Sequence, residues 1–110
     1  MLRIAVHPGE ILKDELDETG VSAAELARQI RVPAGRISQI IAGKRSITGD
    51  TALRLGKWFG TGPELWMNLQ KNYELRLASE DEHVRAEIQQ ISSVATVSTP
   101  FSADRVGKRY

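Results

Sequence analysis

Breaks at glycine and proline divide this sequence into short segments whose apolar residues follow helical spacing. The main breaks fall at Gly20, Pro33, Gly43 and Gly60. Glycine commonly ends a helix, and proline disfavours helical geometry in the residue before it, so each break limits the helix that precedes it. Between the breaks, apolar residues recur three and four positions apart, as on one face of a helix. This pattern limits the chain to a series of short helices, and we find no convincing strand before residue 90.

We predict an all-α domain of five helices over residues 1–78, about the size of one ordinary small domain. The first helix is expected to run from Pro8 to Thr19, the second from Ser22 to no later than Val32, the third from Pro33 to a cap at Gly43, the fourth from Thr48 to Gly60, and the fifth from about Pro63 past Leu77. Ser22 and Glu25 also match a capping box, in which each side chain bonds the backbone N–H of the other residue.

Residues 79–110 are expected to form a short C-terminal extension. Their polar, acidic beginning predicts a short sixth helix that reaches about Ile91, with a second capping box from Ser79 and Glu82. Beyond it, residues 94–98 alternate apolar and polar side chains, as in a lone edge strand. Chain ends without packing partners are usually mobile. We therefore expect either a flexible tail or an edge strand after the sixth helix.

Cationic residues concentrate in the middle third of the chain. Residues 28–57 contain seven lysines and arginines against one acid, a local net charge of +6, although the whole chain carries only +1. Residues 1–27 are acidic instead, with a net charge of −4 from two basic and six acidic residues. A basic region of this kind attracts polyanions such as nucleic acid. On charge alone, a solvated surface is an equally good interpretation.

Several classes of function lack the residues that they need. The chain has no cysteine, which excludes disulfides and Cys-based zinc sites. His7 and His83 are far apart in the sequence, and no serine lies in a nucleophile-elbow pattern. We therefore expect no metal, no cofactor and no catalytic site. No apolar run approaches the ~18 to 20 residues of a membrane helix, and no signal peptide is recognisable, so the expected compartment is the cytoplasm.

The second and third predicted helices form the arrangement with the most functional content. They lie on either side of a tight connection at residues 31–33, and Ala27 is small enough to let the two backbones approach closely. Leu26 on one helix and Ile37 and Ile40 on the other can meet inside the angle. This layout is typical of a helix-turn-helix, whose second helix enters the major groove of DNA.

The residues of this region also resemble a known family. The stretch VSAAELARQIRVPAGRISQI (21–40) resembles the phage-repressor-like (Xre) helix-turn-helix family. With its flanks HPGEIL (7–12), GKRSIT (43–48), TALRLGKWFGT (51–61) and PELWMNLQ (63–70), the chain is similar to HigA-type antitoxins over roughly residues 7 to 78. The resemblance implies a five-helix domain that dimerises, represses its own operon and binds an mRNA-cleaving toxin of the RelE-like HigB kind.

The same resemblance assigns DNA contacts to particular positions, with helix 33–42 as the recognition helix. The implied DNA-binding residues are Ser22, Ala34, Gly35, Arg36, Ser38, Gln39, Lys44 and Arg45. Arg36 is expected to read a guanine edge and Gln39 an adenine edge, while Lys44 and Arg45 hold phosphates and Ser22 brings a helix N-terminus to the DNA backbone. Because Ala34 and Gly35 are small, specificity is expected to rest on few base contacts plus DNA shape.

A stripe on the fifth predicted helix is the expected dimer interface. Trp66, Leu69, Tyr73 and Leu77 recur at i, i+3, i+7 and i+11; part of the stripe is expected to pack on the domain, and the rest to pair with a second subunit. Trp58, together with its neighbour Phe59, is predicted to be a core aromatic.

The partners predicted from the sequence are operator DNA, a second copy of the chain and a RelE/HigB-like toxin. Toxin contact has three candidate sources: the tail from Ser92, the folded domain, and the acidic first helix. Two other functions stay open. One is a stand-alone helix-turn-helix regulator without a toxin. The other is a protein-binding adaptor that has lost DNA binding, which the small residues Ala34 and Gly35 would permit.

Overall fold

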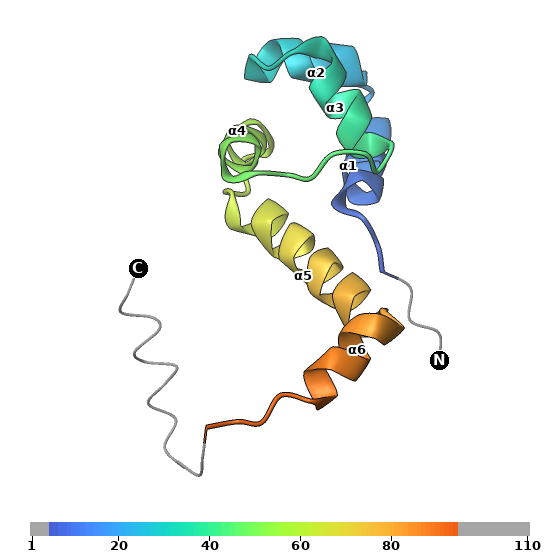
Figure 1. Ribbon diagram of the computed structural model, residues 1–110. Helices are drawn as coiled ribbons and strands as arrows, with labels where there is room; N and C mark the ends of the chain where they lie inside the picture. Colours follow the sequence, from blue (N-terminus) through green and yellow to red (C-terminus); the bar gives the residue numbers. More distant parts are fainter. Residues whose placement is uncertain (1–4, 95–110) are drawn as a thin grey trace.

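The computed structural model of the protein describes residues 5–94. Within this range it contains six helices and no strand (Figure 1): α1 (Pro8–Thr19), α2 (Ala23–Ile30), α3 (Ala34–Ile41), α4 (Gly49–Phe59), α5 (Glu64–Glu80) and α6 (Glu82–Gln89). The all-helical fold is confirmed, and the sixth helix belongs to the extension. The possible edge strand at 94–98 lies almost entirely outside the described residues. None of these six helices is long and apolar enough to cross a membrane.

The helices begin and end at residues whose local chemistry requires it. The side chains of His7, Ser22 and Thr48 each accept a backbone N–H from the first turn of the helix that follows, which satisfies one of its unpaired donors. Gly20 and Gly60 end α1 and α4 in the left-handed conformation, both with φ of 77°. Glycine adopts this conformation without the steric penalty of a side chain.

The start of α6 differs from its prediction. Its N-cap is Asp81, whose Oδ1 accepts from the backbone N–H groups of His83 and Val84 at 2.9 and 3.1 Å. Ser79 is still inside α5, and its hydroxyl donates to the Arg76 carbonyl instead. α5 therefore ends at Glu80, two residues past the expected limit at residue 78, and α6 begins after its N-cap at Asp81.

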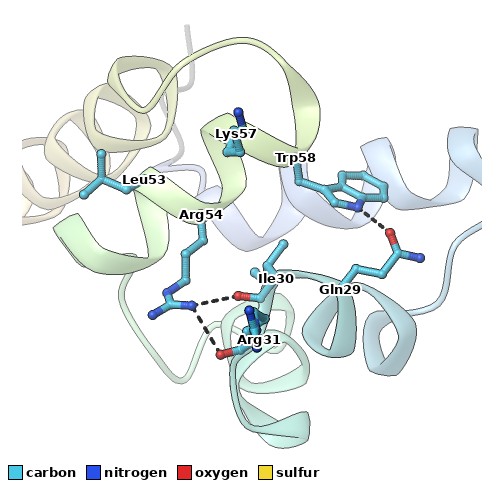
Figure 2. Close-up of a pocket in the computed structure, with 7 residues that line it drawn as sticks. All are labelled: Gln29, Ile30, Arg31, Leu53, Arg54, Lys57 and Trp58. Atoms are coloured by element: carbon cyan, nitrogen blue, oxygen red, sulfur yellow. Dashed lines mark hydrogen bonds between the residues drawn. The ribbon is translucent and has the colours of Figure 1, made fainter.

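One apolar core joins the first five helices. Its buried members are Leu12, Leu16, Leu26, Ala27, Ile30, Ile37, Ile40, Ile47, Ala52, Leu55 and Trp66. Only the first half of α5 reaches this core, through Trp66 and Gln70, and α6 has no buried residue. Trp58 and Phe59, predicted as core aromatics, lie at the edge of the core and are only partly buried. The Trp58 indole N–H reaches the surface and donates to Gln29 Oε1 at 2.7 Å (Figure 2).

Two glycines allow helices to approach more closely than any side chain would permit. A Cβ atom on Gly9 would lie 1.9 Å from the carbonyl oxygen of Ile40, so the start of α1 rests directly on the end of α3. A Cβ atom on Gly56 would lie 2.3 Å from the carbonyl carbon of Gly62, where the chain turns from α4 into α5. The first contact fixes α1 on α3, and the second fixes the turn between α4 and α5.

Candidate nucleic-acid interface

The corner between α2 and α3 has the geometry of a helix-turn-helix. α2 ends at Ile30, and Arg31 takes the left-handed conformation with φ of 65°. Arg31 is the one residue other than glycine with positive φ in the described part of the chain, and this conformation costs about 1 kcal/mol for an L-residue. Val32 N–H then bonds the Ala27 carbonyl at 3.0 Å, which closes the turn. Ala27 is fully buried where the two helices meet.

Most of the predicted groove-facing residues lie on one exposed face of α3. Ile37 and Ile40 turn into the core. Exposed side chains or backbone are found at Ala34, Gly35, Ser38 and Gln39. This follows from helical periodicity, because the residues between the two core positions point away from the domain. The structure thus brings these four predicted positions together on a surface that a duplex can reach.

Arg36 is placed differently from its neighbours. Its side chain is only 26% exposed, and its Nη1 lies 3.8 Å from Asp50 Oδ1 at the start of α4. Its Nε is buried without a hydrogen-bond partner. The guanidinium therefore lies on the flank of α3 that faces α4, and it must leave Asp50 before it can reach a base edge.

The loop after α3 carries two exposed cations beside the α3 face. Lys44 and Arg45 are both exposed, and Arg45 Nε donates to Gln39 Oε1 at 2.9 Å. This bond holds the loop against the exposed face and leaves the Gln39 amide N–H groups available. Ser22 is also exposed, and its hydroxyl caps α2 by accepting from Glu25 N–H at 3.0 Å.

The capping box at the start of α2 forms only in part. The Glu25 carboxylate does not return to Ser22; it accepts hydrogen bonds from Arg28 and Gln29. These bonds, chiefly the one from Arg28, lower the pKa of Glu25 to about 2. Arg28 is therefore a neutralised cation. Among the cations of residues 28–57, those without a carboxylate within 4.0 Å in the described range are Arg31, Lys44, Arg45 and Lys57.

Arg54 is a structural part of the site that the sequence did not reveal. Its Nη1 donates to the carbonyls of Ile30 and Arg31 at 2.8 and 3.3 Å, and so caps the end of α2 (Figure 2). Its Nε donates to Asp50 Oδ1 at 2.7 Å, which lowers the pKa of Asp50. The i,i+4 spacing of Asp50 and Arg54 indicates their ion pair, but no local pattern indicates the contact with a corner 24 residues earlier.

The four residues of the predicted dimer stripe on α5 differ in how deeply they are buried. Trp66 is 1% exposed and belongs to the core of its own chain, so it is the part of the stripe that packs on the domain. Its position is fixed by packing that the stripe alone does not specify. Leu69 packs partly on the same core. The ring of Tyr73 meets His7 edge-on at 4.8 Å. Leu77 is 50% exposed and available to a partner.

No group of three or more potential metal ligands occurs among residues 5–94. The candidate site consists of the exposed face of α3, the cationic loop after it and the corner that positions both.

Comparison with known proteins identifies the family. The helix-turn-helix family pattern matches residues 12–66, which is half of the chain and includes the whole corner. A structure of an addiction module antidote protein of the HigA family from Coxiella burnetii superposes with a TM-score of 0.76 at 41% identity, over 84% of this chain and 100% of that one. The chain belongs to the HigA-type group of helix-turn-helix proteins.

Two further relatives are similar over most of the chain. Pseudomonas aeruginosa antitoxin HigA, solved with the higBA promoter, is 40% identical with a TM-score of 0.76, over 84% of this chain and 100% of that one. Virulence-associated protein I of Dichelobacter nodosus is 46% identical over 79 residues, which are 71% of this chain and 73% of that protein. The sequence-based recognition of the family is thereby confirmed.

Proposed function

We propose that this chain is an autorepressor that binds operator DNA as a dimer, and the antitoxin of a type II toxin–antitoxin pair. The observation that carries the DNA-binding part is the exposed face of α3, flanked by the cations of the following loop on a complete helix-turn-helix corner. The Pseudomonas aeruginosa relative, with 40% identity, was solved with a promoter. Two α3 helices would enter successive major grooves and block the promoter.

The phosphate contacts provide the most direct test of DNA binding. Replacing Lys44 and Arg45 by Ala should weaken binding to an operator duplex and to a scrambled duplex alike, because phosphates are present in both. Losing two phosphate contacts should also flatten the slope of log K against log salt by about 1.8 per protomer. The experiment is a fluorescence-anisotropy titration of both duplexes, the operator being taken from upstream of the gene, at several salt concentrations.

A matched variant separates local contact from total charge. Lys13→Ala with Arg85→Ala also removes two exposed cations, but from α1 and α6 rather than from α3 or its loop. This control should keep nearly the whole salt slope. If it flattens the slope as much as the loop variant does, α3 and its loop are not the DNA-binding surface.

Dimerisation is proposed to use the exposed apolar side chains of the second half of α5. Leu77 is 50% exposed, so a second copy can cover it without disturbing the core. Leu69 and Tyr73 would complete the contact from their partly exposed surfaces. Leu77→Asp should yield a folded monomer in sedimentation equilibrium, whereas a variant that remains dimeric would place the interface elsewhere.

Toxin neutralisation is the second part of the proposal: the chain binds a RelE/HigB-like mRNA-cleaving toxin directly. Its HigA-type membership supports this, together with a strongly acidic exposed surface on α1 that is complementary to a basic ribonuclease. The acidic residues of that surface are Glu10, Asp14, Glu15, Asp17 and Glu18. The folded domain and the tail from Ser92 are the other two candidate contact sites for the toxin.

Co-expression with the adjacent gene tests this part. The adjacent product should be toxic alone, cleave mRNA in vitro, co-purify with this chain and lose its activity in the complex. If no adjacent gene encodes such a protein while operator binding is observed, the chain is instead a stand-alone transcriptional regulator.

A further inference from the structure

One carboxylate at the start of α4 is shared by two arginines from different helices. Asp50 Oδ1 accepts from Arg54 Nε at 2.7 Å and lies 3.8 Å from Arg36 Nη1. Arg54 is held independently by its bonds to the carbonyls of Ile30 and Arg31. Arg36 has no such second anchor, so it is the member of the cluster that is free to move.

Arg36 is also incompletely satisfied in its resting position. Its contact with Asp50, at 3.8 Å, is longer than a hydrogen bond. Its Nε is buried with no partner, and an unpaired buried donor carries a desolvation cost. A ligand that offers two acceptors in one plane can bond the guanidinium more completely than Asp50 does. The O6 and N7 atoms of guanine are such a pair in the major groove.

We propose that Asp50 holds Arg36 against the protein until a base edge competes for its guanidinium, which makes Asp50 a positioning residue for DNA specificity. The inference rests on the DNA-binding function proposed above. Phosphates line every duplex, and an unrestrained Arg36 would bind them whatever the sequence. The Asp50 carboxylate competes with phosphate for this cation and repels the phosphate itself. Non-operator DNA therefore gains little from Arg36, whereas a well-placed guanine does.

Asp50→Asn tests the proposal while preserving the corner. The asparagine Oδ1 still accepts from Arg54, but the charge that attracts Arg36 is gone. Affinity for a scrambled duplex should rise, and the ratio of operator to scrambled affinity should fall by at least threefold. One added phosphate contact per protomer should make the salt slope steeper by about 0.9, which corresponds to a ~3.5-fold larger loss of affinity between about 50 and 200 mM salt.

Two controls show whether the effect passes through Arg36. Asp17→Asn removes the same charge from another i,i+4 pair, with Lys13 on α1, and should leave the ratio unchanged. In an Arg36→Ala background, Asp50→Asn should no longer lower the ratio. The proposal is overturned if Asp50→Asn leaves the ratio as in the wild type, if Asp17→Asn lowers it equally, or if the fall persists without Arg36.

The outcomes also separate this proposal from the function on which it depends. A wild-type chain that shows no salt-dependent duplex binding would refute the DNA-binding function and this inference together. A wild-type chain that binds its operator, with an Asp50→Asn variant of equal specificity, would refute only the role of Asp50. Circular dichroism of each variant establishes that it is folded.

Discussion

The side chain of Gln70 should contribute strongly to stability, because it accepts a hydrogen bond from a buried backbone N–H in the loop between α3 and α4. Gln70 is 4% exposed, and its Oε1 accepts from the Ile47 backbone N–H at 2.8 Å. Ile47 is itself 1% exposed, so water cannot replace this acceptor without a structural change. Gln70→Met keeps the length of the side chain and removes the acceptor. Leaving a buried backbone donor unpaired costs about 1 to 3 kcal/mol, and we expect a loss near 2 kcal/mol.

The control for this prediction uses the other end of the same amide. Gln70 Nε2 donates to Glu74 Oε2 at 2.9 Å, but Glu74 is exposed, so water can replace that bond. Glu74→Ala should therefore cost less than about 0.5 kcal/mol, as surface substitutions usually do. Both variants lose the Gln70–Glu74 bond, but only Gln70→Met leaves the Ile47 N–H without its acceptor.

Urea denaturation at one fixed protein concentration measures both variants, because dimerisation would otherwise shift the apparent stability. With a slope near 2 kcal/mol/M, a loss of 2 kcal/mol lowers the midpoint by about 1 M at unchanged slope. A Gln70→Met midpoint within about 0.2 M of the wild type would refute the reasoning. So would an equal shift in Glu74→Ala, since the Ile47 N–H would then have no special role.

Two further predictions concern the start of α1. Gly9→Ala should destabilise the protein by about 3 kcal/mol, because its methyl group would meet the Ile40 carbonyl oxygen at 1.9 Å and α1 would have to move away from α3. The matched change Gly35→Ala, in α3 with nothing within 4 Å, should instead stabilise the protein by about 0.5 to 1 kcal/mol in the same urea assay. The pKa of His7 is lowered from 6.5, chiefly by desolvation, and its Nδ1 accepts from Gly9 N–H only when unprotonated. The unfolded chain thus binds this proton more readily, so stability is fully present above about pH 6.5 and falls as the pH drops through the folded pKa. His7→Asn, which keeps a capping acceptor that does not titrate, should show a flatter midpoint-against-pH curve between pH 7.5 and 5; an unchanged curve would exclude His7 as the titrating group.

The helices could be predicted from sequence because their signals are local. The apolar spacing, the N-caps such as Ser22 and Thr48, and the terminal glycines all act within a few residues of the helix that they define. The exposed face of α3 was predictable for the same reason, since Ile37 and Ile40 fix which side of that helix is buried. Where two local signals competed, as with Ser79 and Asp81, only the structure decided between them.

Contacts between helices could not be predicted, because no local pattern encodes them. The sequence predicts an apolar stripe on α5. Whether Trp66 in that stripe packs on its own core or on a second chain depends on where α4 places the helix. Arg36 lies one position before the core residue Ile37, at the border of the buried face. Its environment is set by Asp50, 14 residues later, in the first turn of α4. Long-range packing of this kind overrides a sequence-based assignment of one side chain.

The contacts that sequence missed have a common effect, which is to hold α3 and its loop from several directions. Gly9 lets α1 rest on the end of α3, Arg54 fixes the corner before it, and Gln70 ties the following loop to α5. A recognition surface fixed in this way loses little conformational freedom when it meets a duplex, so less of the contact free energy is spent on ordering. The same rigidity explains why one residue can influence specificity. If the backbone of α3 does not move, the main adjustable element left on its flank is the Arg36 side chain, and Asp50 sets the position from which that side chain starts.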